Sequence, residues 1–435
     1  MKSIPFARLL CFLPLIGTVN AQTADDYPRR EAIECRERGG VPNGLAKLRR
    51  GDGGEIRVAY LGGSITAAPG WRVKSLEWLQ QRFPRQKLTE INAAIGGTGS
   101  DLGVFRHGQD VLRHRPDLLF VEFAVNDGGA PPERIHQAME GIVRQTWAAD
   151  PATDIVFVYT ISEPFLSDLK AGKFSRAASA MEAIADHYGI PSIHFGIEVA
   201  DREKAGTLVF KGEKPADGAG GPMVFSTDGV HPLVETGHEI YREVLARSWE
   251  KLEAAAGAAD RPHALQEPFR PDHWQAAKLV PITRAMISGS WEKLDSSESG
   301  DPLARRFARQ MPEMWKATAP GARLAFRFRG TVAGVYDLVG PDGGQLNVVL
   351  DDQPVRIAPR FDAYCTYHRL SKLDIGSGLD PDVEHRATLT LDAASPDKAK
   401  ILFERNRPDL EKNPDKYAGL YWHAGAIMLI GDLVE

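Results

Sequence analysis

Short apolar runs alternate with amphipathic helical patterns from about residue 55 to residue 250, and this alternation constrains the fold more than any other sequence feature. The runs typical of buried strands are IRVAYLG (56–62), KLTEINAAIG (87–96), PDLLFVEFAVND (116–127), DIVFVYTIS (154–162) and IPSIHFG (190–196). Helical patterns cover residues 73–83, 103–114, 131–149, 173–189 and 233–252. Strands alternating with helices predict a parallel sheet in an α/β layered domain. In such a sheet the functional site lies beyond the carboxyl ends of the strands.

The pattern changes after about residue 255. An Ala/Pro-rich stretch is followed by short alternating runs, and turn signals such as GPDGG (340–344) and LDDQP (350–354) separate them. This spacing predicts an antiparallel β-sandwich. We therefore expect an α/β domain over residues 22–255, a linker over 256–279 and a β-sandwich over 280–435.

The first 21 residues have the pattern of an export signal. Lys2 and Arg8 precede the apolar run LLCFLPLIG, and the small residues of VNA follow before Gln22. We predict cleavage after Ala21 and a periplasmic or secreted protein. The apolar run is too short to span a membrane, and no other stretch has the pattern of a transmembrane segment.

Composition excludes few functions. The formal net charge is −5 and no block of Lys or Arg occurs, so nothing indicates nucleic-acid binding. Two cysteines, Cys35 and Cys365, remain after the predicted cleavage, and the sequence leaves their pairing open. Neither H-E-x-x-H nor C-x-x-C occurs, so we predict no metal and no cofactor.

Small and polar residues follow the ends of four predicted elements. Ser64 follows the run 56–62, Gly96 and Gly97 follow the second run, and Asn126 ends the third. STDGVHP (226–232) precedes the last helix and contains an Asp and a His three residues apart, Asp228 and His231. In order and spacing, the four segments resemble the conserved blocks of the SGNH, or GDSL-type, serine hydrolase superfamily.

The resemblance covers residues 55–250 and implies a flavodoxin-like hydrolase domain with a Ser-His-Asp triad. Ser64 would be the nucleophile, because a serine hydroxyl attacks only after a base takes its proton. His231 would be that base, and Asp228 would fix its tautomer and stabilise the imidazolium. The family also implies an oxyanion hole formed by the N–H groups of Ser64 and Gly97 and by the side-chain amide of Asn126.

Two details of the blocks differ from the family or need a choice. Gly63 stands where the family usually has an aspartate, so contacts of that aspartate must come from elsewhere. Gly97 is preferred to Gly96 as the oxyanion donor because it lies five residues after Asn92, as in the family. A simpler interpretation of Asp228 is that it caps the following helix.

Four further residues are candidates for substrate binding. Trp71 lies close to the nucleophile and either packs in the core or forms a wall for a sugar. Asp127 follows Asn126 in the third block. The segment YCTYHRL (364–370) contributes His368 and Arg369, which either complete the cleft or lie on the outer face of a strand.

The sequence thus predicts an exported serine esterase that removes O-acetyl or other short acyl groups from a carbohydrate. An alternative of the same class is a lipase or lysophospholipase. A glycan-binding protein without activity remains a second alternative. A third is a glycan-cleaving enzyme that uses acids such as Glu122 or Asp127. The β-sandwich resembles carbohydrate-binding modules only at the level of the fold. The sequence does not indicate an oligomeric state.

Overall fold

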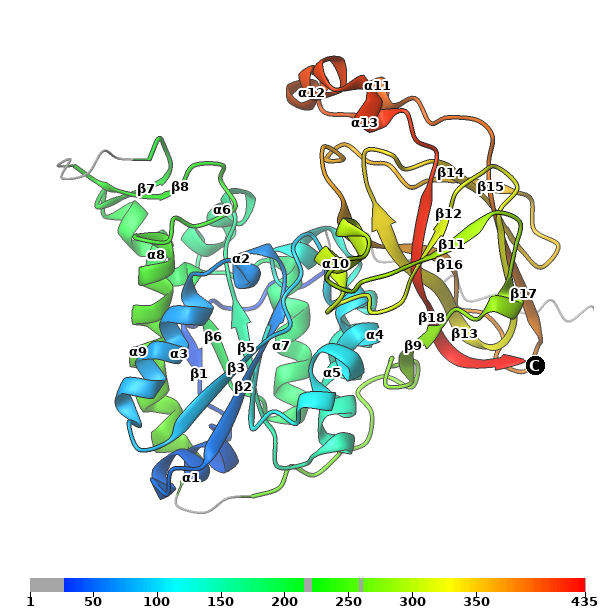
Figure 1. Cartoon of the computed structure of the whole chain (residues 1–435). Helices are drawn as coiled ribbons and strands as arrows, with labels where there is room; N and C mark the ends of the chain where they lie inside the picture. Colours follow the sequence, from blue (N-terminus) through cyan, green and yellow to red (C-terminus); the bar gives the residue numbers. More distant parts are fainter. Residues whose placement is uncertain (1–26, 215–220, 258–260, 435) are drawn as a thin grey trace, which may run out of the picture.

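The computed structural model describes residues 27–214, 221–257 and 261–434, so the predicted signal peptide and its cleavage after Ala21 lie outside the described residues. Two large sheets dominate the chain, one parallel and covered by helices, the other antiparallel (Figure 1). Among the described helices, none has the length and apolar character that a membrane crossing requires. The predicted fold class, an α/β domain followed by an antiparallel β-domain, is confirmed.

The α/β domain is built on a six-stranded sheet in the order β1-β6-β5-β4-β2-β3, in which only β1 runs antiparallel to its neighbour. Its strands are β1 (Cys35–Arg36), β2 (Glu55–Gly62), β3 (Lys87–Asn92), β4 (Leu118–Glu122), β5 (Asp154–Tyr159) and β6 (Ser192–His194). The central strands β4 and β5 are buried along their whole length, as parallel strands covered on both faces must be. This burial explains why they appear in the sequence as unbroken apolar runs.

Helices cover both faces of this sheet. One layer contains α1 (Pro42–Arg50), α3 (Trp71–Arg82), α8 (Gly196–Lys204) and α9 (Gly237–Ala256). The other contains α4 (Ser100–Asp110), α5 (Pro132–Ala149) and α7 (Arg176–Tyr188), and the two layers flank the sheet in Figure 1. Short elements at the strand ends complete the domain: α2 (Ser64–Ala67), η1 (Leu112–His114), η2 (Asn126–Gly129), η3 (Glu163–Phe165), α6 (Leu166–Lys170) and the parallel pair β7 (Leu208–Lys211) and β8 (Met223–Ser226).

The last helix of the domain begins later than the sequence predicts. Its pattern indicated residues 233–252, but α9 starts at Gly237. The backbone N–H of Leu233 donates to the carbonyl of Phe225 at 2.7 Å, which ties residue 233 to β8 instead. The segment between β8 and α9 is therefore a loop held against a strand.

The β-domain is a ten-stranded antiparallel sheet that closes around its own apolar cluster. Its strands are β9 (Ala277–Pro281), β10 (Ile287–Ser288), β11 (Trp291–Leu294), β12 (Met314–Ala317), β13 (Arg323–Val339), β14 (Gln345–Leu350), β15 (Arg356–Pro359), β16 (Arg369–Ser377), β17 (His385–Leu391) and β18 (Trp422–Val434). The short helices are η4 (Arg284–Met286), α10 (Pro302–Phe307), α11 (Lys398–Ile401), η5 (Glu404–Asn406), α12 (Arg407–Lys412) and α13 (Pro414–Tyr417).

Strand β13 joins the two layers of this domain. Its first half pairs with β17 and its second half with β16, while β18 follows it on the other side. Burial alternates along the first half, but every residue from Ala333 to Val339 is buried. The second half is therefore covered on both faces, which an isolated sandwich would not require.

The segment expected to link the domains is bound to the α/β domain. Within it, Ala277 already belongs to β9, which pairs with β18. Earlier in the segment, the carboxylate of the buried Glu140 accepts the N–H groups of Phe269 and Arg270. Arg144 of α5 donates to the carbonyl of Gln266 at 2.8 Å. These contacts make the connection part of the folded surface.

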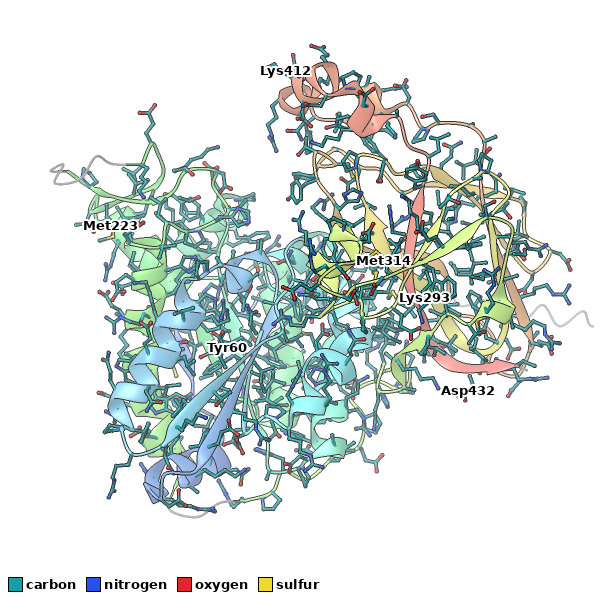
Figure 2. All side chains as sticks on the ribbon, in the orientation of Figure 1. Tyr60, Met223, Lys293, Met314, Lys412 and Asp432 are labelled. Carbon is teal, nitrogen blue, oxygen red and sulfur yellow. The ribbon has the colours of Figure 1, made fainter. Side chains whose placement is uncertain are left out.

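The two domains share one continuous apolar cluster. It contains the core of the α/β sheet together with residues of the β-domain such as Phe307, Met311, Tyr336 and Met428. Figure 2 labels one member on each side, Tyr60 of β2 and Met314 of β12. Ion pairs lie at the edge of this contact, between Lys372 and Asp101 at 3.1 Å and between Arg134 and Asp374 at 3.5 Å.

Both mature cysteines are free and buried. Cys35 lies in the parallel sheet and Cys365 in the β-domain, so the open question of their pairing is answered by their separate positions.

Candidate active site

Ser64 lies at the turn between β2 and α2. The strand ends at Gly62, Gly63 precedes the helix, and Ser64 is its first residue. Beneath the turn, the fully buried Glu122 accepts hydrogen bonds from Thr66 Oγ1 at 2.8 Å and Thr160 Oγ1 at 2.7 Å. Burial raises the pKa of Glu122, although these bonds and one from the Gly63 N–H oppose the rise. Glu122 thus supports the turn from below.

His231 connects Ser64 to Asp228. Its Nε2 lies 2.8 Å from Ser64 Oγ, and its Nδ1 lies 2.7 Å from Asp228 Oδ2. These are hydrogen-bond distances within the range of a nucleophile, base and orienting acid. The structure therefore brings together the three residues that the sequence predicted to act as a triad.

Asp228 is held by its own loop. Its Oδ1 accepts the N–H groups of Val230 and His231, both at 2.8 Å, and the hydroxyl of Ser226 at 3.0 Å. Partial burial opposes ionisation, but the bonds from the His231 ring and from the two N–H groups outweigh it and lower the pKa of Asp228. The carboxylate is therefore charged at neutral pH. The simpler interpretation of Asp228 as a helix cap is wrong, because α9 begins nine residues later at Gly237.

Asn126 occupies space that a side chain at position 63 would need. A Cβ built on Gly63 would lie 1.8 Å from Asn126 Oδ1 and 2.6 Å from its Cγ. The amide of Asn126 therefore lies directly against the turn that carries the nucleophile. The glycine that departs from the family pattern is the residue that permits this close approach.

Gly96 and Gly97 are both exposed beside the nucleophile. A Cβ on Gly96 would make ordinary contact with Ser64 Cβ at 3.5 Å. Gly97 has a φ of +74°, a left-handed conformation that favours glycine. The turn that both residues form continues into α4, whose first N–H, that of Ser100, donates to Asp127 Oδ1 at 3.0 Å.

Arg369 of the β-domain reaches the same place. Its Nη1 lies 3.7 Å from the position that a Cβ on Gly97 would take. Its Nη2 donates to both carboxylate oxygens of Asp362. The guanidinium carbon lies 5.5 Å from the ring centre of Tyr364 and 5.9 Å from that of Tyr367, and both rings are 49 % exposed. The second domain therefore places a cation beside Gly97, with two half-exposed tyrosines around that cation.

Two of the predicted substrate-binding residues are not accessible. Trp71 is fully buried, with its ring centre 5.4 Å from that of Tyr60 and 5.3 Å from that of Phe195. The interpretation of Trp71 as a sugar-binding wall is therefore wrong, and its role is packing. Asp127 is 2 % exposed, and burial raises its pKa to about 7. Its place under the first turn of α4 makes it a support for the glycine turn instead of a ligand for substrate.

The side chain of His368 makes its hydrogen bond within the β-domain and not with Ser64. Its Nε2 is 2.6 Å from Asp342 Oδ1 within the β-domain, so its side chain is engaged there. Of the two residues predicted from YCTYHRL, the structure brings Arg369 to Gly97 and leaves His368 within the β-domain.

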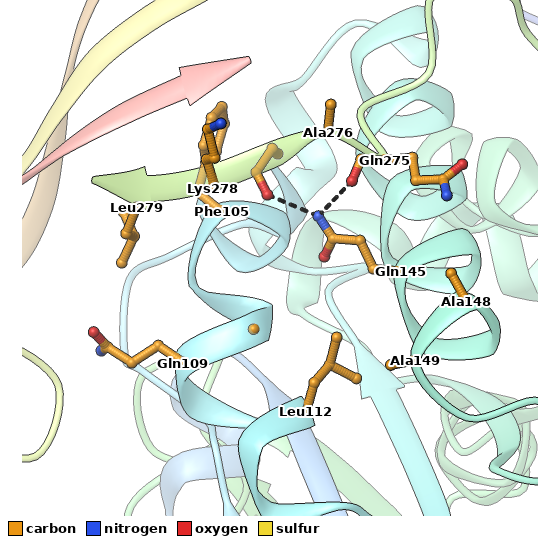
Figure 3. Close-up of a pocket in the computed structure, with 12 residues that line it drawn as sticks. Phe105, Gln109, Leu112, Gln145, Ala148, Ala149, Gln275, Ala276, Lys278 and Leu279 are labelled. Carbon is orange, nitrogen blue, oxygen red and sulfur yellow. Dashed lines mark hydrogen bonds between the residues drawn. The ribbon is translucent and has the colours of Figure 1, made fainter. Parts of the chain in front are cut away.

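A hollow lies between α4, α5 and β9 (Figure 3). Its volume is about 640 Å³, and apolar residues, glutamines and Lys278 line it. Gln145 donates there to the carbonyls of Gln275 at 3.1 Å and Ala277 at 2.9 Å. These bonds hold the inter-domain segment on α5. The hollow has no nucleophile or acid among its lining residues, so it offers no alternative centre for hydrolysis.

Several residues that shape the site were not predicted from the sequence. Ser226 lies two residues before Asp228 and was visible in STDGVHP, but nothing there indicated its hydrogen bond. Thr66 and Thr160 contact Glu122 from separate segments, and Asp362 contacts Arg369. Such contacts depend on the tertiary fold and leave no signal in a single sequence.

Comparison with known proteins agrees with the sequence blocks. Residues 60–239 match the model of the GDSL-like lipase/acylhydrolase family. The predicted resemblance to SGNH/GDSL-type hydrolases, and with it the predicted class of ester hydrolase, is confirmed. No curated protein matches the chain.

Solved structures resemble both domains together. A two-domain esterase active on acetylated mannans, co-crystallised with mannopentaose, is 17% identical with a TM-score of 0.68, over 94% of this chain and 100% of that chain. A second structure described as a two-domain esterase active on acetylated mannans is 18% identical with a TM-score of 0.67, over 92% and 98%. At this identity the likeness establishes the two-domain fold.

Proposed function

We propose that this protein is an exported serine esterase that removes O-acetyl or other short acyl groups from a carbohydrate. The observation that carries the proposal is the hydrogen-bonded series Ser64–His231–Asp228, with distances of 2.8 and 2.7 Å, at the carboxyl end of a parallel strand. The family match over residues 60–239 supports the same chemistry.

In the proposed reaction His231 Nε2 takes the proton of Ser64 Oγ as the hydroxyl attacks the ester carbonyl. Asp228 accepts the Nδ1–H, fixes the tautomer and stabilises the imidazolium. The oxyanion accepts hydrogen bonds from the N–H groups of Ser64 and Gly97 and from the amide of Asn126. His231 then gives its proton to the departing sugar hydroxyl. His231 then takes a proton from a water molecule as the water attacks the acyl carbonyl. The bond between that carbonyl and Ser64 Oγ breaks, His231 returns the proton to Ser64, and the acid leaves.

The preference for a sugar over a lipid rests on the second domain. Arg369 presents a hydrogen-bond donor beside Gly97, and the exposed Tyr364 and Tyr367 surround its guanidinium. Aromatic faces that carry polar groups suit the alternating apolar and hydroxyl surfaces of a sugar ring. The two-domain structural relative is described as active on acetylated mannans, which makes an acetylated mannan the first substrate to test.

The remaining alternatives have less support. A glycan-cleaving mechanism needs two accessible carboxyl groups, but Glu122 and Asp127 are 0% and 2% exposed. A pure glycan-binding role would leave the complete Ser64–His231–Asp228 arrangement without a use. The export part of the proposal rests on the sequence of residues 1–21, and mass spectrometry of the protein recovered outside the cytoplasm would test the cleavage after Ala21.

The test is acetate release from acetylated mannan, acetylated xylan and an aryl acetate, with long-chain aryl esters as the lipase alternative. Ser64→Ala should lose hydrolysis of every ester while keeping its thermal unfolding temperature. Tyr367→Ala should lower kcat/KM for the polysaccharide about 10-fold, a cost of ~1–1.5 kcal/mol for one aromatic contact, and leave the aryl acetate nearly unchanged. Val383→Ala, equally exposed in the same domain, is the matched control. A folded Ser64→Ala that still turns over the aryl acetate, or a preference for long-chain esters, would overturn the proposal.

A further inference from the structure

Three side chains with metal-binding atoms meet in the β-domain. Asp342 belongs to the turn after β13, His368 directly precedes β16, and His423 is the second residue of β18. One ligand atom from each lies within 4.8 Å of the others. The rings of His368 and His423 meet edge to face, with centres 5.5 Å apart. Segments far apart in the sequence therefore converge on one point.

His423 adds a buried member to the partly exposed pair of Asp342 and His368. It is 3% exposed, and in the part of the chain that the structure describes its ring makes no hydrogen bond. An imidazole has one N–H donor and one acceptor, and a metal ion can take the acceptor nitrogen. The ring is directed at Asp342 and His368, so a ligand between the three side chains would satisfy it.

The backbone around the cluster is held firmly. The buried ammonium of Lys398 donates to the carbonyls of Pro341, Tyr417 and Gly419 at 2.9, 2.6 and 2.9 Å. The N–H of Tyr421 donates to the carbonyl of Asp342 at 2.9 Å, which joins the turn to the start of β18. The side chains consequently need only rotate to change their mutual distances.

We propose that Asp342, His368 and His423 form a binding site for a divalent transition-metal ion, and that Zn²⁺ fits it. Two imidazoles and one carboxylate are the donors that Zn²⁺ takes in proteins, at about 2.0–2.2 Å, with the fourth position open to water. Such ligands lie about 3.3 Å apart around a tetrahedral ion. The present separations, from 2.6 Å to at most 4.8 Å, bracket that value.

Binding exchanges a hydrogen bond for coordination. His368 Nε2 now lies 2.6 Å from Asp342 Oδ1, so one of these atoms carries the shared proton. On binding, the neutral His368 keeps its single proton on Nδ1 and offers Nε2 to the ion, while Asp342 binds as a carboxylate. Lys316 weakens the binding of a cation, because it is the cross-strand partner of His423 and carries a positive charge. Its ammonium group lies 4.0 Å from the ring centre of Tyr421.

The metal site has a consequence for the candidate active site, because His368 directly precedes Arg369. An ion that fixes His368 also fixes the start of β16, from which Arg369 extends to Gly97. The metal therefore acts as a structural element that orders residues 360–369 and places Arg369. It takes no part in ester hydrolysis.

The experiment is calorimetric titration of tag-free, chelator-treated protein with Zn²⁺, together with metal analysis after dialysis. We expect one ion per chain and a higher unfolding temperature in Zn²⁺. His368→Gln and Asp342→Asn, on partly exposed residues, should each weaken binding at least about 100-fold, the upper range for losing even an outer partner of a ligand. His423→Gln should do the same, and the two more exposed variants keep the test valid if this buried one fails to fold.

The matched control is His385→Gln. His385 Nδ1 pairs with Asp351 at 2.8 Å in the same domain but without a second histidine, so this variant should bind Zn²⁺ as the original protein does. His231→Gln controls for Zn²⁺ at the nucleophile and should also leave the stoichiometry at one. Lys316→Met should tighten Zn²⁺ binding. The proposal is overturned by no binding at about 100 μM Zn²⁺, a concentration far above the Kd of ~0.05 μM that corresponds to ~10 kcal/mol for a structural site. It is also overturned by loss of binding in either control, or by weaker binding in Lys316→Met.

Discussion

Gly63→Ala tests whether the departure from the family pattern serves the oxyanion hole. The new Cβ would lie 1.8 Å from Asn126 Oδ1, whereas real Cβ atoms essentially never approach closer than 3.0 Å. The amide must therefore move by about 1.2 Å, the difference between 3.0 and 1.8 Å. It can move, because the atoms in the way are the end of a side chain and not backbone.

The size of the effect follows from that displacement. A donor about 2.9 Å from the oxyanion ceases to be a hydrogen bond when it retreats by more than 1 Å. Loss of one oxyanion donor costs about 2.7–4 kcal/mol in the transition state, or about 10²–10³ in kcat. Stability changes much less: overpacking that a side-chain rotation relieves costs about 1 kcal/mol, equivalent to ~2–4 °C in Tm.

The assay is kcat for an aryl acetate, with Tm measured on the same samples. Gly129→Ala is the matched control, because residue 129 lies in the same short turn as Asn126 and a Cβ there has nothing within 4 Å. If the alanine acts through Asn126, the double variant Gly63→Ala/Asn126→Ala should be no slower than Asn126→Ala alone. A double variant much slower than Asn126→Ala would falsify the reasoning, as would full activity in Gly63→Ala.

Three further predictions concern the triad, a buried acid and the domain contact. Asp228→Asn should lower kcat by about 10⁴, because the wrong tautomer of His231 is then favoured, and nearly full activity in the variant would contradict this role. Burial raises the pKa of Asp127 to about 7, so the folded state binds this proton more tightly than the unfolded state, and stability is lost as pH rises from about 4 to 7. In urea unfolding, the free energy of unfolding of Asp127→Asn should therefore increase relative to that of the original protein between pH 5 and pH 8. A difference that does not depend on pH would rule this out. Truncation at Pro281 should give an aggregating fragment by light scattering, because the shared apolar cluster is exposed; a monomeric, folded fragment would refute the claim of one core.

Much of the α/β domain was predictable because its signals are local. β4 and β5 are buried on both faces, so their sequences are unbroken apolar runs, and Asn126 follows the first of them closely. Parallel strands bring such ends to one edge of the sheet. The order of the four blocks then led to Ser64, Asp228 and His231, which the structure places within hydrogen-bond distance.

The remainder depended on packing between distant segments. Trp71 lies close to Ser64 in the sequence and Asp127 directly follows Asn126, but neither position reveals which way the side chain points. The domain contact did leave one overlooked signal. VAGVYDLV in the second half of β13 lacks the alternation of an exposed sandwich strand, because the α/β domain covers its other face.

The continuous core also determines when the two parts of the candidate site become ordered. Ser64 stands on one domain and Arg369 on the other, yet the residues between them are packed as a single interior. No hinge closure is needed to bring Ser64 and Arg369 to the same substrate. Fixing the distance between Ser64 and Arg369 costs conformational entropy. The chain loses this entropy once, when it folds, and does not lose it again each time a substrate binds.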